Sequence, residues 1–244
     1  MKKVLLAAFL LSLPFLAAAQ EENTEGEEVP HGFIKEQIEQ HGGFRIVSIT
    51  ETKGDLAIFG DNDFVETGCP KKLVEELERL RRKGLRIVDV QHTEKGSWIV
   101  IYGENDYSSS LLGHPSLYRT MRAKLLELKQ KKVPIRNFSF SESGYWAIVT
   151  ERSTGEEDAD YSIESIGELQ GFLGQQGEHG NVLAVRFSEN GGIAVYETGS
   201  VHFGDVPEEL LDMVSDDNAK VTAVSFSGGS WFLSFGEEEF SYDL

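Results

Sequence analysis

Cysteine is almost absent from this sequence, which contains only Cys69. One cysteine excludes an intramolecular disulfide, so the folded chain must be held together by its core. Cys69 precedes Pro70 at the start of a predicted helix, a position where a thiolate can be stabilised. This loop lies outside the repeated strands described below, so we expect no catalytic thiol.

Catalytic and cofactor motifs are also missing. The six histidines occur singly, and neither HExxH, GxSxG, a phosphate-binding loop nor a dinucleotide fingerprint is present. We therefore expect a protein that is not an enzyme and has no cofactor. The alternative is a secreted hydrolase, directed at glycans for example, because distant members of its 41 acidic residues could meet in a central channel.

Long apolar runs are limited to the N-terminus. Lys2 and Lys3 precede an apolar stretch over 4–16, and small residues follow at 17–19. This pattern predicts a cleaved signal peptide over 1–19, because the run is too short to cross a bilayer. Residues 20–29 are acidic and predict a disordered leader. We expect an exported protein, periplasmic or extracellular, that does not span a membrane.

Positive charge is scarce overall but concentrated in one segment. The net charge is −18 and the pI is about 4.7, which argues against nucleic acid as a partner. Residues 71–136 nevertheless carry 15 Lys and Arg against 8 Asp and Glu. Residues 137–244 carry 3 against 21. This asymmetry predicts either an anionic protein partner or self-association through opposite charge, unless the bases only complement helix C-termini. The predicted partner-binding residues are Arg79, Arg82, Arg122 and Lys132.

What the sequence does contain is a repeat, clearest over residues 86–107. An apolar strand, a polar turn ending in glycine, a second strand opened by a large apolar residue, an acidic turn and a short third strand follow one another, which is the pattern of a β-meander. Related segments begin at Phe44, Ile135, Val182 and Val221. We predict five such units.

Each repeat is anchored by a glycine that we expect to adopt positive φ in the hairpin turn. These glycines are Gly54, Gly96, Gly144, Gly191 and Gly229. Two residues later stands a large apolar side chain, predicted to fill the core of its unit rather than to form a ring of exposed sugar-stacking tryptophans. These positions are Leu56, Trp98, Trp146, Ile193 and Trp231.

A one-sided helix is predicted before each meander, usually announced by a proline at Pro30, Pro70, Pro115 or Pro207. The fourth helix, from about Ile163, lacks this proline. The expected single repeat domain covers 30–244, with units at about 30–68, 69–110, 111–162, 163–205 and 206–244.

The predicted fold is thus an α+β repeat protein of five α-βββ units. Since one meander cannot bury its own face, neighbouring units must share a core. Two arrangements stay open: a closed propeller-like ring with helices outside, and an open α/β solenoid. The lack of an evident polar cap favours the ring.

The segment VTAVSFSGGSWFLSFG, from Val221, resembles the inner strands of a WD-type β-propeller blade. The likeness covers about twenty residues per unit, but the Trp-Asp and Gly-His dipeptides of that family are absent, and a helix stands where a blade has its outer strand. A five-fold ring with outer helices is also similar to the α/β-propeller (pentein) architecture. Both resemblances imply a central channel, and WD-type propellers are mostly binding platforms.

Acidic turns between the second and third strands predict one acidic rim, because they occupy equivalent repeat positions. Clustered oxygens could bind calcium there, although acidic residues are also common turn formers and no EF-hand spacing is present. The candidate ligands are Asp61, Asp63, Glu104, Asp106, Glu157 and Asp158. Taken together, the sequence predicts an exported, non-catalytic platform that binds a protein or another charged partner.

Overall fold

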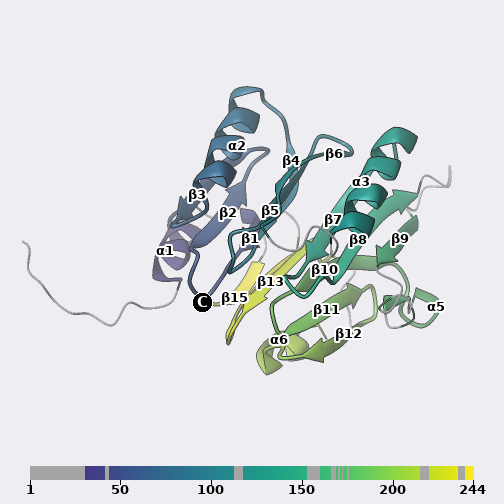
Figure 1. The fold of residues 1–244 in the computed structure, drawn as a ribbon. Helices are drawn as coiled ribbons and strands as arrows, with labels where there is room; N and C mark the ends of the chain where they lie inside the picture. Colours follow the sequence, from purple (N-terminus) through teal and green to yellow (C-terminus); the bar gives the residue numbers. More distant parts are fainter. Residues whose placement is uncertain are drawn as a thin grey trace, which may run out of the picture.

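The computed structural model describes residues 31–41, 44–112, 118–152, 160–165, 169, 171, 173–174, 176–214, 220–235 and 240–244. The predicted signal peptide, the acidic leader and the prolines at positions 30 and 115 lie outside these residues. Within the described part, the strands form five three-stranded antiparallel sheets, each with its strands in sequence order. The predicted repeat of helix and antiparallel meander is therefore confirmed (Figure 1).

The five sheets have closely similar bounds. They consist of β1 (Phe44–Ser48), β2 (Asp55–Phe59) and β3 (Asp63–Thr67); β4 (Ile87–His92), β5 (Trp98–Tyr102) and β6 (Asp106–Ser110); β7 (Ile135–Phe140), β8 (Trp146–Arg152) and β9 (Asp160–Ser165); β10 (Val182–Phe187), β11 (Gly191–Tyr196) and β12 (Gly199–Gly204); and β13 (Ala223–Ser227), β14 (Ser230–Ser234) and β15 (Phe240–Asp243).

The helices are α1 (Gly32–His41), α2 (Lys71–Arg82), α3 (Arg119–Lys131), α5 (Gln176–His179) and α6 (Glu208–Met213). Pro70 and Pro207 immediately precede α2 and α6, where a missing N–H costs no helical hydrogen bond. No helix in the described ranges is long and apolar enough to cross a membrane.

The predicted start of the fourth helix at about Ile163 is wrong. Ile163 lies in β9 and pairs with Val149 of β8. The apolar residues Tyr161 and Ile163 alternate with polar ones, which is the period of a strand. The third unit therefore extends at least to Ser165, beyond the predicted boundary at 162.

The hairpin glycines follow the prediction in the first three units only. Gly54, Gly96 and Gly144 have φ of +81°, +80° and +89°. At Gly54 a Cβ atom would lie 1.7 Å from the carbonyl oxygen of Thr67, so no larger residue fits. The same prediction is wrong for Gly191 and Gly229, neither of which has positive φ. Gly191 opens β11 in the fourth unit, and in the fifth the preceding Gly228 takes the turn conformation, with φ +56°.

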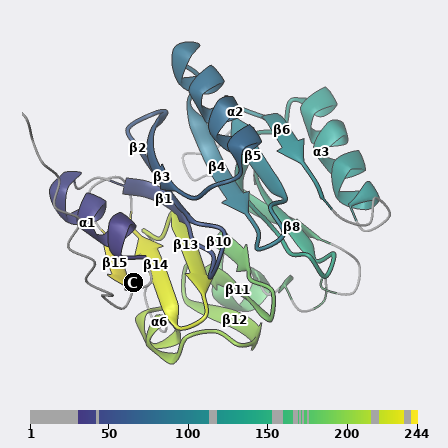
Figure 2. The ribbon, with the colours of Figure 1, turned by 60° about the vertical axis from the view of Figure 1, so that its left-hand side comes forward.

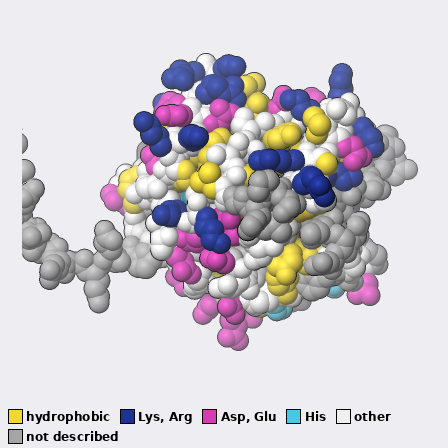
Figure 3. All heavy atoms as spheres, in the orientation of Figure 1, with side chains coloured by type: hydrophobic (Ala, Val, Ile, Leu, Met, Phe, Trp, Pro, Cys, Tyr) yellow, Lys and Arg dark blue, Asp and Glu magenta, His cyan; other side chains and the backbone are white. Residues whose placement is uncertain are grey.

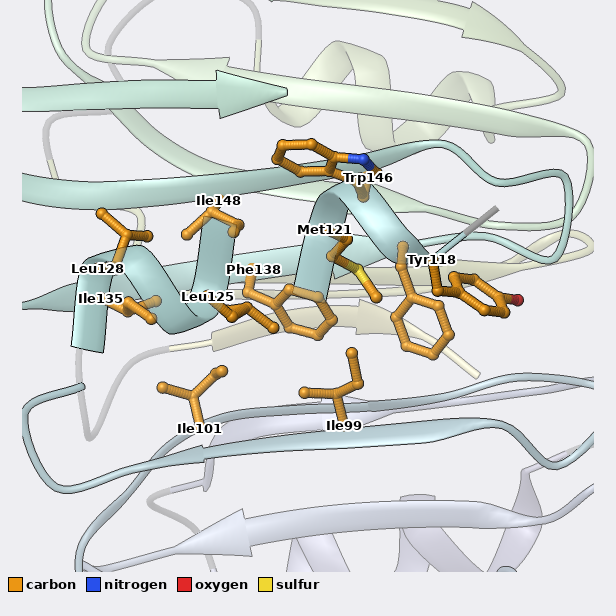
Figure 4. Close-up of a cluster of buried hydrophobic side chains, with 11 residues drawn as sticks. Ile99, Ile101, Tyr118, Met121, Leu125, Leu128, Ile135, Phe138, Trp146 and Ile148 are labelled. Atoms are coloured by element: carbon orange, nitrogen blue, oxygen red, sulfur yellow. The ribbon is translucent and has the colours of Figure 1, made fainter. Parts of the chain in front are cut away.

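Five hydrophobic clusters join the units. In each cluster, a helical segment packs between two sheets. In one, Leu73, Leu77 and Leu80 of α2 contact strands of the first and second units. In the next, Met121, Leu125 and Leu128 of α3 lie between the second and third units, with Trp146 and Ile148 on one side and Ile99 and Ile101 on the other (Figure 4). The helices thus pack between sheets rather than over a single sheet.

The three tryptophans belong to these clusters. Trp98, Trp146 and Trp231 are buried, with 6%, 4% and 5% of their surface exposed. Each stands at the start of, or one residue into, the second strand of its unit. They contribute to the core and are not available to stack on a ligand.

The last of the five clusters connects the two ends of the described fold. Ile34 and Ile38 of α1 pack with Phe44 of the first unit and with Phe232 and Leu244 of the fifth. Both ribbon views place the C-terminus beside α1 (Figures 1 and 2). The first and fifth units therefore share a core in the same way as sequence neighbours do.

The first strand of each unit, here called the inner strand, contacts the inner strands of two other units. These contacts join β1 to β4, β4 to β7, β7 to β10, β10 to β13, and β13 to β1. The inner strands belong to separate sheets, so no β-ladder links them. Polar side chains form the hydrogen bonds that a β-ladder would otherwise supply, because buried backbone N–H groups need acceptors.

These polar links recur at equivalent positions. Ser48 Oγ, Gln91 Oε1 and Ser139 Oγ accept the backbone N–H groups of His92, Phe140 and Phe187, at 3.2, 3.0 and 2.7 Å. Two residues earlier, Asp89 and Asn137 accept from Phe138 and Val185, at 2.9 and 2.7 Å. The first three inner strands therefore each satisfy N–H groups of the next one, and we call these bonds the side-chain ladder.

Replacing Ser139 by alanine tests the ladder. Ser139→Ala leaves the buried Phe187 N–H without its acceptor, which we expect to lower the free energy of unfolding by about 1–3 kcal/mol. Urea denaturation followed by circular dichroism measures this loss. Ser143→Ala, in the exposed turn nearby, is the matched control and should leave the midpoint unchanged. Equal midpoints for both variants would contradict the role given to the ladder.

Candidate functional site

A pocket of about 360 Å³ lies at the C-terminal ends of the inner strands. All five units contribute the end of the inner strand and the turn after it. We call this hollow the central pocket. Its lining consists of residues 48–51, 91–94, 140–142, 186–190 and 225–228, together with Asp205.

The lining repeats a short pattern of a hydroxyl residue followed by glutamate. The hydroxyl residues are Thr50, Thr93, Ser141, Ser188 and Ser227, and the glutamates are Glu51, Glu94, Glu142 and Glu189, with Gly228 in the fifth unit. Sequence analysis missed these residues, although the pattern is legible there as TE, TE, SE, SE and SG ahead of each anchor glycine. Alignment of the repeats on those glycines would have found it.

Arg186 lies at the floor of the pocket and is 1% exposed. Its Nε donates to the carbonyl oxygen of Val224 at 2.8 Å, and its Nη2 lies 3.4 Å from Asp89 Oδ1. Within the described part of the chain, Arg186 Nη1 and the hydroxyl Ser141 Oγ of the same pocket lining are buried without a hydrogen-bond partner. Two donors from the lining of one pocket therefore remain unused.

Asp89 is the counter-ion of Arg186, and its carboxylate oxygens are occupied by hydrogen bonds within the fold. Besides Arg186, its carboxylate accepts from Asn137 Nδ2 at 2.7 Å and from the N–H groups of Val90 and Phe138. Burial raises the pKa of Asp89, and Arg186 and these donors act against that rise. Burial also lowers the pKa of Arg186, opposed by Asp89. The pair links β4 to β10 across β7 and leaves Asp89 no open position for proton transfer.

His92 and Cys69 lie close together, but their environment does not activate the thiol. His92 Nε2 donates to the carbonyl oxygen of Gly54 at 2.9 Å, which leaves Nδ1 to accept from the Ser48 hydroxyl at 2.8 Å. Burial lowers the pKa of His92 and raises the pKa of the Cys69 thiol. Cys69 Sγ donates to the carbonyl oxygen of Asp55 at 3.3 Å. A neutral thiol beside a neutral imidazole is a packing arrangement, since the nucleophile would have to be the thiolate.

Two of the four glutamates hold neighbouring turns together. Glu94, in the second unit, accepts from the N–H of Glu51 and from Thr52 N and Oγ1 in the first, the latter two at 3.1 and 2.6 Å. Glu142 accepts from the Thr93 hydroxyl of the second unit and from Tyr118 Oη, the latter at 3.1 Å. Burial and Glu142 raise the pKa of Tyr118 to about 12, so this phenol stays a donor at neutral pH. Glu51 and Glu189 are exposed at the rim.

The four predicted partner-binding residues lie on or directly after α2 and α3, away from the central pocket. Arg79 forms an ion pair with Glu76 at 2.6 Å and lies over the ring of Tyr102. Arg82, Arg122 and Lys132 are exposed, and Lys132 ends α3 with φ +54°. In the surface view, lysine and arginine side chains gather over the half of the face where α2 and α3 lie (Figure 3). The basic surface exists, and no contact in the structure assigns it a partner.

The predicted acidic rim is partly neutralised by bases of neighbouring elements. Asp61 pairs with Arg86 at 2.8 Å, and Asp106 pairs with Lys129 at 2.5 Å. Asp63 is exposed at the start of β3 and Glu104 is exposed in the turn before β6, whereas Glu157 and Asp158 lie outside the described residues. In the part of the chain that the structure describes, no group of three His, Cys, Asp or Glu residues has a geometry suited to a metal ion.

The buried His92 predicts a loss of stability in acid. Its pKa lies below the ordinary value of 6.5 in the folded state, so the unfolded chain binds the proton more tightly. The stability that His92 contributes is present above pH 6.5 and is lost as the pH falls below it. His92→Phe, which installs the residue found at Phe140, Phe187 and Phe226, should flatten this part of the profile. Urea unfolding between about pH 7 and pH 5 measures it. An unchanged slope in the variant would show that His92 does not carry the effect.

Comparison with known proteins does not assign the chain to a family. No family model and no curated protein matches it. Among solved structures, it is similar to the C-terminal domain of gp131 from bacteriophage phiKZ, with a TM-score of 0.38 and 12% sequence identity. That match covers 64% of this chain and 51% of the other, so it spans about half the length of the phage chain.

Proposed function

We propose that this protein is an exported, non-catalytic binding protein that takes a charged partner at the central pocket. The observation that carries the proposal is the composition of the lining, to which all five units contribute equivalent residues. A pocket of about 360 Å³ lies in the size range of small-molecule sites and also admits a single protruding side chain or chain end of a larger partner. Export rests on the signal-peptide pattern over residues 1–19.

The proposal includes closure of the five units into a propeller-like ring around this pocket. Closure is supported by the contact of β13 with β1 and by the cluster that α1 forms with Phe44 and Phe232. An open solenoid would leave the apolar faces of its end units to solvent or to capping elements. Here α1 lies between the first and the fifth sheet, as α2 lies between the first and the second.

A binding role suits the pocket better than catalysis does. Glu94 and Glu142 already accept hydrogen bonds that join one turn to the next, and Asp89 is bound on all sides in the floor. A glycoside hydrolase needs one carboxyl group to act as acid and a second, across the scissile bond, to act as base or nucleophile. The hydrolase alternative would have to recruit the remaining rim carboxylates of Glu51, Glu189 and Asp205.

The basic surface of α2 and α3 adds a second contact to the proposal. Arg82, Arg122 and Lys132 extend from this surface, where an acidic protein partner or the acidic half of a second copy would be attracted. Such attraction weakens as salt is raised, because the charges are exposed.

Ring closure predicts that a destabilising substitution in the fifth unit also destabilises the first unit. Phe232→Ala removes a ring from the cluster shared by α1, β1 and β14, which we expect to cost about 3–5 kcal/mol. Hydrogen exchange of the β1 and β2 amides should then accelerate together with that of β14. Met213→Ala, at a 44% exposed position of α6, is the control and should change neither. Faster exchange confined to the fifth unit would favour the open solenoid.

Pocket binding is tested by thermal denaturation of residues 20–244 with acetate, inorganic phosphate, L-glutamate, L-lysine or an N-acetylglucosamine trisaccharide. We expect at least one charged probe to raise the melting temperature, because a ligand that binds only the folded state stabilises it. Ser227→Trp, which fills the pocket, should abolish the shift, and Gln130→Trp on the exposed face of α3 should retain it. No shift with any probe would contradict the proposal, and release of reducing ends from the trisaccharide would favour the hydrolase.

A further inference from the structure

We infer that the central pocket recognises a small amphoteric ligand, whose carboxylate binds Arg186 and Ser141 at the floor while its cationic group faces the glutamate rim. This inference deepens the proposed function and rests on it. The ligand class is that of a basic amino acid, either free or as the C-terminal residue of a peptide.

The first step is the pair of unused donors. Arg186 is 1% exposed and Ser141 is 2% exposed, and Nη1 of the one and Oγ of the other have no partner among the described residues. A buried donor without an acceptor costs about 1–3 kcal/mol, and a charged donor costs more. Both residues line the central pocket, so we place the acceptor that would satisfy them in this pocket.

The second step concerns the charge of that acceptor. A guanidinium nitrogen and a hydroxyl both donate well to a carboxylate or phosphate oxygen. Asp89 already offsets part of the charge of Arg186, at 3.4 Å from Nη2. The floor therefore offers less than one full positive charge, which favours a carboxylate over a phosphate dianion.

The third step concerns the rim. The lining contains Glu51, Glu94, Glu142, Glu189 and Asp205, while Arg186 is its one permanently charged base. His92 adds no positive charge at neutral pH, since burial lowers its pKa. Such a lining repels a purely anionic ligand and attracts a cation to the mouth. A ligand that satisfies both ends has to carry both charges.

Calorimetry at low salt with L-lysine and cadaverine tests this assignment, because cadaverine is lysine without its carboxylate. We expect L-lysine to bind at least about tenfold more tightly than cadaverine. Ser141→Ala should weaken L-lysine about tenfold and leave cadaverine unchanged. Glu189→Gln should weaken both probes equally, and Ser143→Ala, an exposed turn residue, should affect neither.

Arg186→Lys is a second, riskier variant, because it disturbs the buried pair with Asp89. If it folds by circular dichroism, it should weaken L-lysine more than cadaverine. Because Ser141→Ala removes only a hydroxyl, it keeps the test decisive if Arg186→Lys does not fold. Comparison of L-lysine with N-acetyl-L-lysine separates the two sources: retained binding of the acetylated probe indicates a peptide C-terminus, and its loss indicates a free amino acid.

Several results would overturn the inference. Equal affinities of L-lysine and cadaverine, or equal losses of both in Ser141→Ala, would mean that the floor holds only water and no carboxylate. Tighter binding of inorganic phosphate or acetate than of L-lysine would contradict the role of the rim. Another probe could still raise the melting temperature, with Ser227→Trp abolishing that shift. Any of the results above would then remove only the assignment to amphoteric ligands, and the pocket would remain a binding site. Absence of binding by all probes would remove both.

Discussion

The fold depends on hydrogen bonds that polar side chains of one inner strand make to the backbone of the next. Five sheets that meet edge to edge at their inner strands leave unpaired N–H groups where water is excluded. Ser48, Gln91 and Ser139 supply acceptors at one level, and Asp89 and Asn137 at the level below. The middle of this molecule is therefore polar, and the apolar clusters lie between the sheets.

The side-chain ladder and the central pocket share residues at equivalent positions of the repeat. The positions of Ser48, Gln91 and Ser139 correspond in the repeat to Arg186 and Ser225, so the residue that forms the floor of the pocket occupies a ladder position. In the fourth unit the short acceptor is replaced by a long donor, and Arg186 reaches the carbonyl oxygen of Val224 and the carboxylate of Asp89. Among these five equivalent positions only Arg186 is charged, which gives the pocket lining one permanently charged base.

Much of the architecture could be predicted from the sequence because it depends on local signals. Positive φ at Gly54 and the burial of Trp98 follow from turn chemistry and apolar periodicity within one unit. The prediction was wrong where a unit departs from the average, as at Gly191, where the fourth unit begins its second strand directly. It is also wrong at Ile163, because residues 160–165 alternate between apolar and polar and form β9 where the repeat spacing predicts a helix.

The central pocket could not be predicted from local signals, because its residues are far apart in the sequence. Charge was summed along the chain, which separated a basic segment from an acidic one. The structure instead brings together residues of equal repeat position, so Glu94 of the basic segment faces the same pocket as Glu142 and Glu189 of the acidic segment. The Asp89–Arg186 pair, 97 residues apart in sequence, has no local signature at all.

The cluster of α1 with Phe232 and Leu244 has a consequence for how the chain is threaded. Both ends of the described fold contribute to the same core, so position 244 lies close to the first described helix. Joining position 244 to position 31 through a short linker and opening the chain in the turn between α2 and β4 would then keep all five three-stranded sheets. The order of the units along the chain is then one of several that would give the same packed arrangement.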